Sequence, residues 1–243
     1  MRKILIILCL LIANEVYAQS CIPKPDCADM GYTETSCEGG ALKCPFDTTK
    51  LFCTASLPPA VECDVGMIYY SNGKCYSEYS TSYGIALGIV VVGDSLVMGT
   101  PSSIDWSPVS TSVDIPSIPN LPFDGATGDM DGKAHTLAIV AQYENTSGDV
   151  AGVHCNNLAL TGTKAGDWYS PASGELYVYV YRNYNILQSA FDAMGWDMSK
   201  EFWSSSESSI SSGSNAMYVI PKTGGISYDY KYEDRYVSCF LEI

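Results

Sequence analysis

The sequence predicts an exported chain in two parts, a small cysteine-rich module followed by a larger α+β domain. Three observations lead to this prediction. The chain begins with a secretory signal pattern, its 243 residues include ten cysteines, and its longer C-terminal part mixes helical apolar stripes with strand-like runs. We expect a signal peptide over 1–18, the module with its proline linker over 19–60, and the α+β domain over 61–243.

The signal peptide is predicted from charge, apolar run and cleavage motif. Arg2 and Lys3 precede an apolar stretch, and V-Y-A ends at Ala18 just before Gln19. The apolar stretch is too short for a permanent membrane anchor, and no later stretch is long and apolar enough to cross a bilayer. We therefore expect a secreted, periplasmic or cell-surface protein without a transmembrane segment.

The cysteines predict disulfide bonds, because exported proteins meet oxidising conditions. One of the ten, Cys9, belongs to the signal peptide, which leaves nine. The module holds five of these: Cys21, Cys27, Cys37, Cys44 and Cys53. The odd total leaves one cysteine unpaired, bonded between molecules or lipidated. Lipidation of Cys21 would leave an even number, but the residues before it match a lipidation signal poorly. A zinc site is disfavoured because no C-x-x-C pair is present.

The charge balance indicates which partners suit the mature chain. Lys and Arg total 13 and Asp and Glu total 27; removing two basic residues and Glu15 with the signal leaves 11 against 26, a net charge near −15. This balance argues against nucleic acid, anionic lipid and sulfated polysaccharide as ligands. We expect a neutral or basic partner.

Two hairpins are predicted at the start of the domain. Ser71-Asn72-Gly73 is a turn signal, and Cys63 and Cys75 flank this hairpin where a disulfide could bridge it. The run 84–92, followed by 95–98, predicts a second hairpin, with its first strand buried on both faces. The region 102–128 is rich in Ser, Pro and Asp and predicts a long surface excursion.

Helices are predicted in the middle of the domain. Asp131 can cap a helix that runs to about Tyr143, and a second helix is expected over 149–160. Ser170 is the expected N-cap of a third helix over 171–183, even though L-Y-V-Y-V-Y within it alternates like a strand. A fourth apolar stripe, over 187–194, ends at Gly195.

Strands are predicted near the C-terminus. Phe202 and Trp203 indicate a short strand, after which the serine run 204–214 predicts an exposed loop. Further strands are expected over 215–220, 226–232 and 236–241. In the middle one of these, Ile226, Tyr228, Tyr230 and Tyr232 share one face.

Four motifs occur in the same order as in a known family. They are D-G-K-A-H-T at 131–136, the cysteine of V-H-C-N-N, W-Y-S-P-A-S-G-E-L at 168–176, and F-W-S-S-S-E at 202–207 followed by Y-V-S-C-F at 236–240. From about Val61 to its end, the chain resembles the bacterial Lcl C-terminal-type domain found in collagen-like surface adhesins. It departs from that family at Ser170, where leucine is usual, and at Ser238, where arginine is frequent.

The resemblance implies a C-type-lectin-like fold, with short helices packed on small antiparallel sheets. It also implies a structural disulfide between Cys155 and Cys239, which would tie a helix to the last strand. We expect Trp168 and Trp203, from two of the four motifs, to be buried core residues.

Catalytic and metal motifs are missing from the sequence. It contains no G-x-S-x-G, P-loop or G-x-G-x-x-G, and its two histidines, His135 and His154, do not form H-E-x-x-H. The reactive cysteine pair of the fold's catalytic relatives, the formylglycine-generating enzymes, has no counterpart if Cys155 and Cys239 are bridged. The calcium signatures of sugar-binding lectins are also missing, and Asp124, Asp129 and Asp131 lack EF-hand spacing. We expect no catalytic residue, no metal site and no cofactor.

These observations favour an exported, non-enzymatic binding module, an adhesin that recognises neutral glycans or protein surfaces without calcium. Loops presented by a rigid scaffold are common binding sites. We therefore predict a site in the serine-rich loop and after it, with Glu207 and Asn215 as polar groups and Tyr228 as a stacking face. Because a half-buried strand also selects tyrosine, we expect Tyr228 and Tyr230 to be core residues first and ligand platforms second. The alternative function is a structural envelope or appendage subunit that binds neighbouring proteins.

Overall fold

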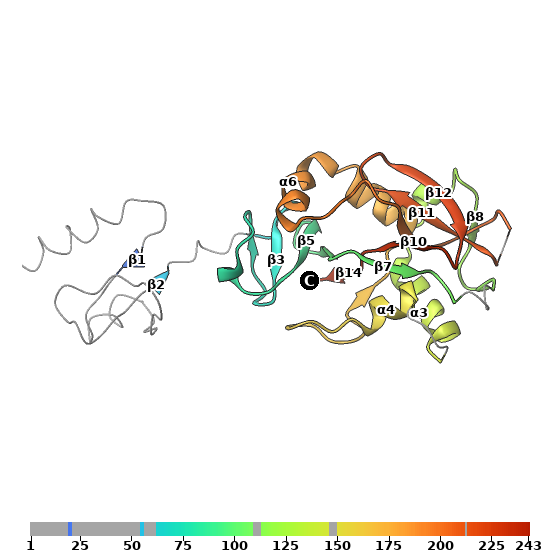
Figure 1. Cartoon of the computed structure of the whole chain (residues 1–243), viewed down its shortest axis with the longest axis horizontal. Helices are drawn as coiled ribbons and strands as arrows, with labels where there is room; N and C mark the ends of the chain where they lie inside the picture. Colours follow the sequence, from blue (N-terminus) through green and yellow to red (C-terminus); the bar gives the residue numbers. More distant parts are fainter. Residues whose placement is uncertain (1–18, 21–53, 56–61, 109–112, 146–149, 212) are drawn as a thin grey trace, which may run out of the picture. The chain divides into compact units, whose positions relative to one another are not determined.

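The computed structural model describes residues 19–20, 54–55, 62–108, 113–145, 150–211 and 213–243 (Figure 1). The chain divides into two compact units, Met1–Pro59 and Ala60–Ile243. In the first unit the described part is a two-stranded antiparallel sheet of β1 (Gln19–Ser20) and β2 (Thr54–Ala55). The predicted signal peptide, Cys21 and the other four module cysteines lie outside the described residues.

The first sheet of the larger unit contains both predicted hairpins. Its strand order is β4-β3-β5-β6-β14-β9, and all neighbours are antiparallel. The strands are β3 (Ile68–Tyr70), β4 (Cys75–Tyr76), β5 (Ala86–Val92), β6 (Leu96–Gly99), β9 (Trp168–Tyr169) and β14 (Phe240–Glu242). The Cys63–Cys75 disulfide predicted from the hairpin is present.

The second sheet has the order β12-β11-β10-β13-β7, with β8 also paired to β10. Its strands are β7 (Ser102–Asp105), β8 (Asn120–Leu121), β10 (Phe202–Ser208), β11 (Asn215–Ile220), β12 (Gly225–Tyr230) and β13 (Asp234–Val237). Strand β10 is antiparallel to β11 on one side and parallel to β13 and β8 on the other. It therefore lies in the interior of the sheet, whereas within the described ranges β12 pairs with β11 alone.

Two predictions about strands are wrong. The segment expected as one strand over 236–241 forms two, β13 in the second sheet and β14 in the first, because the chain crosses between sheets at Ser238 and Cys239. The region 102–128 is not a surface excursion throughout. It contains β7, β8 and a 3-10 helix, η2 (Ala126–Gly128), and it buries Trp106, whose indole N–H donates to the Ser204 carbonyl at 2.7 Å.

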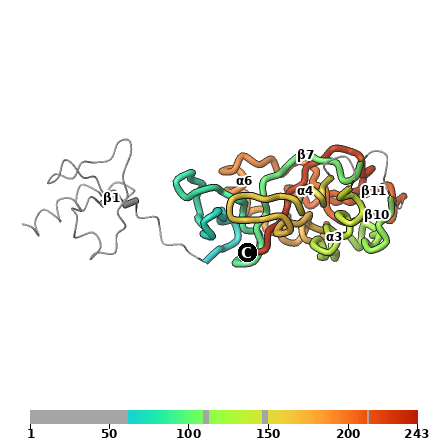
Figure 2. Tube along the Cα trace, turned by 90° about the horizontal axis from the view of Figure 1, so that it is seen from below, coloured from blue at the N-terminus to red at the C-terminus, as the bar shows by residue number. Residues whose placement is uncertain are grey.

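The predicted helices are present. They are α3 (Gly132–Tyr143), α4 (Ala151–Asn157), α5 (Ser173–Glu175) with the π-helix η3 (Leu176–Tyr181), and α6 (Tyr184–Met194), together with the short 3-10 helix η1 (Thr81–Tyr83). Helix α6 ends, as predicted, at Gly195, which has the left-handed φ of 71°. Figures 1 and 2 place α3 and α4 beside each other next to β10, and α6 lies against β5.

The prediction of helix over L-Y-V-Y-V-Y is confirmed, but the predicted N-cap is wrong. The residue before the helix is Ala172, whose N–H donates to Glu175 Oε2 at 2.7 Å. Ser170 instead lies one residue beyond β9 and is buried. Its N–H donates to Thr136 Oγ1 at 2.8 Å, so this residue fixes α3 rather than starting a helix.

The core consists of two apolar clusters. One contains Trp106, Trp168 and Trp203, and the other contains Phe191 and Phe202. Trp168 is 1 % exposed and Trp203 is fully buried, which confirms both as core residues. The Cys155–Cys239 disulfide implied by the family resemblance is present and ties α4 to the crossing between the two sheets. Among the described residues, no helix has the length and apolarity needed to cross a lipid bilayer.

Candidate binding surface and the buried polar centre

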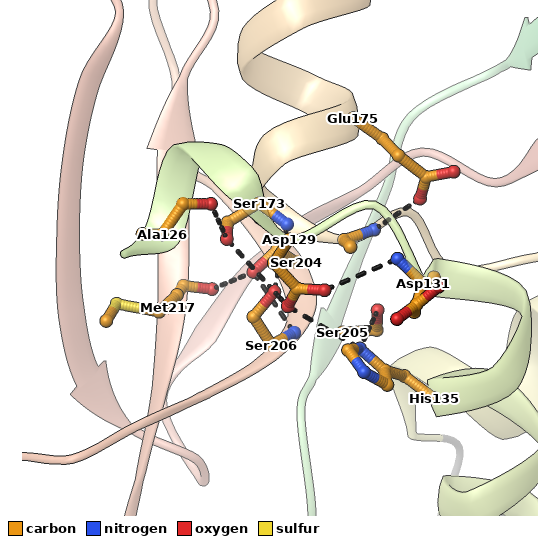
Figure 3. A network of polar contacts seen from close by, with 12 residues as sticks. Ala126, Asp129, Asp131, His135, Ser173, Glu175, Ser204, Ser205, Ser206 and Met217 are labelled. Atoms are coloured by element: carbon orange, nitrogen blue, oxygen red, sulfur yellow. Dashed lines mark hydrogen bonds and ion pairs between the residues drawn. The ribbon is translucent and has the colours of Figure 1, made fainter. Parts of the chain in front are cut away.

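The serine run is not an exposed loop at its start. Ser204 to Ser208 belong to β10 and are completely buried, which corrects the loop prediction. The reason is the interior position of β10, where three serine hydroxyls find partners from distant segments (Figure 3). Ser204 Oγ donates to the Met217 carbonyl at 2.9 Å, and Ser206 Oγ donates to Asp129 Oδ2 at 2.5 Å.

Ser206 connects β10 to the segments that cover it. Besides its bond to Asp129, it accepts a hydrogen bond from the Ser173 N–H at 2.9 Å. Ser173 Oγ in turn donates to the Ala126 carbonyl at 2.7 Å. Buried polar groups need such partners to offset their lost hydration. These contacts join β10, η2 and α5 in one network, visible in Figure 3.

Glu175 is a buried carboxylate beside this network. Its Oε2 accepts from the Ala172 N–H and its Oε1 accepts from the Tyr169 hydroxyl at 2.9 Å. Burial raises the pKa of the Glu175 carboxyl to about 7, although both hydrogen bonds act in the opposite direction. Gly132 leaves room for this carboxylate, since a Cβ there would lie 2.2 Å from Oε2.

His135 and Asp129 lie beside Ser205, and these three residue types are the ones that form the catalytic relay of serine hydrolases. Both contacts of His135 use the same ring nitrogen: Nδ1 lies 3.4 Å from Ser205 Oγ and 3.7 Å from Asp129 Oδ2. A serine hydrolase relay instead uses the two ring nitrogens for its two partners. Burial lowers the pKa of His135, with Asp129 opposing the shift. With Ser205 fully buried, a dissolved substrate does not reach this hydroxyl.

Glu207, predicted as a ligand-binding group, is fully buried instead. It forms an ion pair with the buried Lys231 and accepts from the Ile115 N–H at 3.3 Å. Lys231 Nζ also donates to the Val113 carbonyl at 2.7 Å and lies 4.3 Å from the centre of the Trp106 ring. Burial raises the pKa of Glu207 and lowers the pKa of Lys231, while their mutual attraction opposes both shifts. Through Ile115 and Lys231, Glu207 therefore joins β10 to the segment before β8 and to the residue that follows β12.

Asn215, the second predicted polar group, is only 5 % exposed. Glu207 pairs with Ala216, the neighbour of Asn215, so Glu207 and Asn215 point to opposite faces of the sheet. Asn215 lies opposite Tyr230 in the register of β11 and β12, and its Oδ1 has no hydrogen-bond partner in the described part of the chain. The structure thus does not bring the predicted polar pair together.

Tyr228, the third predicted residue, is partly exposed and belongs to a row of aromatic side chains. Its ring centre lies 5.3 Å from that of Phe123, while the Tyr230 and Tyr232 rings stack at 5.2 Å with 9° between their planes. Tyr228 and Tyr230 share one face of β12 because they are two residues apart. We call Phe123, Tyr228, Tyr230 and Tyr232 the aromatic row.

The aromatic row is accessible to solvent. Tyr230 is 48 % exposed, Phe123 46 % and Tyr232 37 %, so the interpretation of Tyr230 as a core residue is wrong. The reason is that β12 is the outer strand of this sheet, with one neighbouring strand, β11, among the described residues. In the sequence, the alternating tyrosines indicated part of the aromatic row. No local pattern indicated that Phe123, far away in the chain, would join the row.

Charged groups surround the row unevenly. Asp124 beside Phe123 and Glu233 beside Tyr232 are exposed, which makes both ends of the row acidic. Asp229 points to the other face, where its Oδ2 accepts from Arg235 at 2.5 Å. The Arg235 guanidinium lies over the Trp203 and Tyr218 rings, so this cation is already engaged.

Two surface depressions lie away from the predicted site residues. One, of about 260 Å³, is lined by Lys133 and Glu242, which form an exposed ion pair. The other, of about 320 Å³, is lined by Glu201 and Arg235, which are also paired. In the portion of the chain that the structure describes, no group of three His, Cys, Asp or Glu side chains is arranged to hold a metal ion. The aromatic row is therefore the strongest candidate for a binding surface.

Comparison of the chain with protein-family models and with curated proteins finds no match. The resemblance to the Lcl C-terminal-type domain stays a prediction, and the structural evidence supports the coarser description, an α+β unit with two sheets and two disulfides.

Proposed function

We propose that this protein is an exported, non-enzymatic binding module, an adhesin that takes an uncharged glycan on the aromatic row. The observation that carries the proposal is the accessible row itself, in which Tyr230 stacks on Tyr232 and Phe123 contacts Tyr228. The motif resemblance and the Cys155–Cys239 disulfide further support a C-type-lectin-like fold for the larger unit.

Tyrosine suits such a surface for physical reasons. It presents a large apolar ring together with a polar hydroxyl, and it loses little conformational entropy when it is immobilised by a ligand. The two-residue spacing of Tyr228 and Tyr230 places their side chains roughly 7 Å apart along the strand. A chain of sugar units could therefore contact successive rings at once.

The charge distribution favours a neutral ligand. The acidic ends of the row, at Asp124 and Glu233, and the net charge of −14 repel sulfated and other anionic sugars. The exposed groups of the row are aromatic rings and hydroxyls rather than metal ligands. We therefore propose that binding is independent of calcium.

The test is titration of the mature chain against an array of neutral oligosaccharides, with sulfated oligosaccharides as the negative set. We expect Tyr230→Ala to weaken binding at least tenfold, because it removes one ring of the stacked pair. Tyr230→Phe should keep binding within about threefold, since the ring remains. Tyr79→Ala is the matched control: Tyr79 is 47 % exposed but is not part of the row.

Three results would count against this proposal. Binding that a chelator abolishes would show a metal-dependent site, and binding unchanged in Tyr230→Ala would place the ligand elsewhere. A stable oligomer that binds none of the neutral oligosaccharides would favour the alternative, a structural envelope or appendage subunit.

A further inference from the structure

The Lys231–Glu207 pair differs from an ordinary lysine–glutamate contact by its burial. Both of its side chains are 0 % exposed. Lys133 and Glu242 form a contact between the same two residue types, but their side chains are 54 % and 57 % exposed. Water stabilises the charged forms of an exposed pair, whereas a buried amine and carboxyl lose that hydration and gain from becoming neutral. The buried pair therefore has a chemistry that the exposed pair lacks.

Surrounding groups hold the amine against the carboxyl. Lys231 Nζ contacts Glu207 Oε1 and donates to the Val113 carbonyl at 2.7 Å. The Trp106 ring covers Nζ with its centre 4.3 Å away. The Ile115 N–H lies 3.3 Å from each of the two carboxylate oxygens. Two reacting groups fixed at contact distance behave as if their concentration were very high.

The same burial favours the reactive forms of both groups. Burial raises the pKa of the Glu207 carboxyl and lowers the pKa of the Lys231 amine, each against the attraction of the other. Transfer of one proton from Nζ to the carboxylate converts the ion pair into a neutral amine beside a carboxylic acid. A neutral lysine amine has a free electron pair and is a nucleophile, which the ammonium form is not.

Asp114 supplies a third group at this place. Its carboxyl shares a side-chain hydrogen bond with the Glu207 carboxyl. A hydrogen bond between two carboxyls needs a proton on one of them, so these two groups can exchange a proton directly. Asn120 Nδ2 donates to Asp114 Oδ1 at 2.7 Å and orients it. Asp114 is exposed, so a released water molecule can leave on its side.

We propose that Lys231 and Glu207 condense in the folded protein to form an intramolecular amide bond. Nζ bonds to Glu207 Cδ, one Cδ–O bond breaks, and one water molecule leaves. Asp114 takes the proton that Nζ gives up and passes it to the departing hydroxyl, so Asp114 ends unchanged and the step needs no oxidant or reductant. The Ile115 N–H donates to the oxygen that carries negative charge during the attack and that remains as the amide carbonyl.

The amide would tie the outer strand of the sheet to its interior. Lys231 directly follows β12 and Glu207 belongs to β10, with 24 positions between them in the sequence. The bond closes this stretch into a covalent loop, which limits the freedom of the unfolded chain as a disulfide does. Unlike a disulfide, it withstands reducing agents. This inference does not depend on the proposed function.

Peptide mapping of the full exported chain by mass spectrometry is the direct test. Trypsin should release 201–222 joined to 223–235, because an acylated Lys231 is no longer a cleavage site. The mass of this branched peptide should equal the sum of the two peptides minus one water molecule, and fragmentation should place the link at Glu207 and Lys231. Lys133 and Glu242 are the internal control, since this exposed pair should remain unlinked.

The timing of the reaction tests the role of burial. A chain produced unfolded and kept in urea should remain linear, whereas the same chain should acquire the link after it is refolded with its disulfides. Asp114→Asn keeps an acceptor for Asn120 and should slow the link at least tenfold. Asp124→Asn is the matched control, because Asp124 is also exposed but is not among the groups that act on Glu207.

The variant Lys231→Met should yield linear peptides alone. Its loss of stability does not test the amide, because the ion pair by itself predicts that loss; the mass of the peptides does. A folded wild-type chain that gives linear 201–222 and no branched peptide would overturn the proposal. So would a link that forms equally fast in urea, or one that Asp114→Asn leaves as fast as in the wild type. Failure of the proposed function is separate, because it concerns glycan binding by Tyr230→Ala.

Discussion

Strands β10 and β12 lie on opposite sides of β11, and their burial is the reverse of what their amino-acid composition suggests. All seven residues of β10 are buried although five of them are serine or glutamate, whereas every residue of β12, including Ile226, Tyr228 and Tyr230, is partly or largely exposed. Position in the sheet, interior or outer, decides this difference more than residue type. The comparison separates a buried polar centre on β10 from a partly exposed row of aromatic side chains on β12.

The two strands also differ in what their side chains require. A buried hydroxyl or carboxylate without a partner costs about 1–3 kcal/mol, so β10 depends on partners such as Asp129 and Lys231. The exposed rings of β12 need no partner in the unbound protein. Substitutions in the polar centre should therefore change stability, and substitutions in the aromatic row should change binding.

The largest effect is expected for Lys231→Met. It leaves the Glu207 carboxylate buried without its cation, and breaking a buried ion pair in this way costs about 3–5 kcal/mol. Urea denaturation measures the loss in the free energy of unfolding. Lys200→Met removes an exposed lysine paired with Asp197 and should change that free energy by less than about 1 kcal/mol.

A double variant sharpens this prediction. Glu207→Leu combined with Lys231→Met removes both charges, so it should recover much of the stability that Lys231→Met loses. If the double variant is as unstable as the single one, packing of the lysine chain against Trp106 rather than the unpaired charge causes the loss.

The next effect is the pH dependence that Glu175 confers. Its pKa is raised from 4.5 to about 7 in the folded protein, so the folded state binds the proton more tightly than the unfolded state does. The stability is fully present below pH 4.5 and falls as pH rises toward 7, by about 3 kcal/mol. Glu175→Gln should remove this part of the fall. Urea titrations of both chains at pH 4 and pH 8 test it, and equal falls in the two chains would contradict the assignment.

The smallest effect on stability is expected for Tyr230→Ala. Because Tyr230 is 48 % exposed, its removal should change the free energy of unfolding by no more than about 0.5 kcal/mol. Thermal or urea unfolding checks this, and a large loss would mean that the aromatic row supports the fold instead of serving as a binding surface.

Local patterns predicted much of this fold because their physical causes are local. The Ser71-Asn72-Gly73 turn, the apolar stripe of α6 and its Gly195 end each depend on neighbouring residues only, and all are present. The Cys63–Cys75 disulfide follows from such a turn. Of the predicted binding residues Glu207, Asn215 and Tyr228, only Tyr228 reaches the accessible surface. Its place on β12 was predicted from the alternation of residues along the strand, which is also a local pattern.

Tertiary contacts decided the rest. Whether a run of serines becomes a solvated loop or an interior strand depends on acceptors such as Asp129, which lies 77 residues away from Ser206 in the chain. Ser170 caps no helix because α5 begins only at Ser173, and the Ser170 N–H instead donates to Thr136, 34 residues earlier. By itself the sequence determined the helices, the hairpins and their turns, through periodicity and backbone preference. The three-dimensional structure alone decided which strand lies inside the sheet, and hence why Glu207 is buried while Tyr230 faces solvent. Burial depends on contacts between residues that lie far apart in the sequence, and local sequence patterns do not predict such contacts.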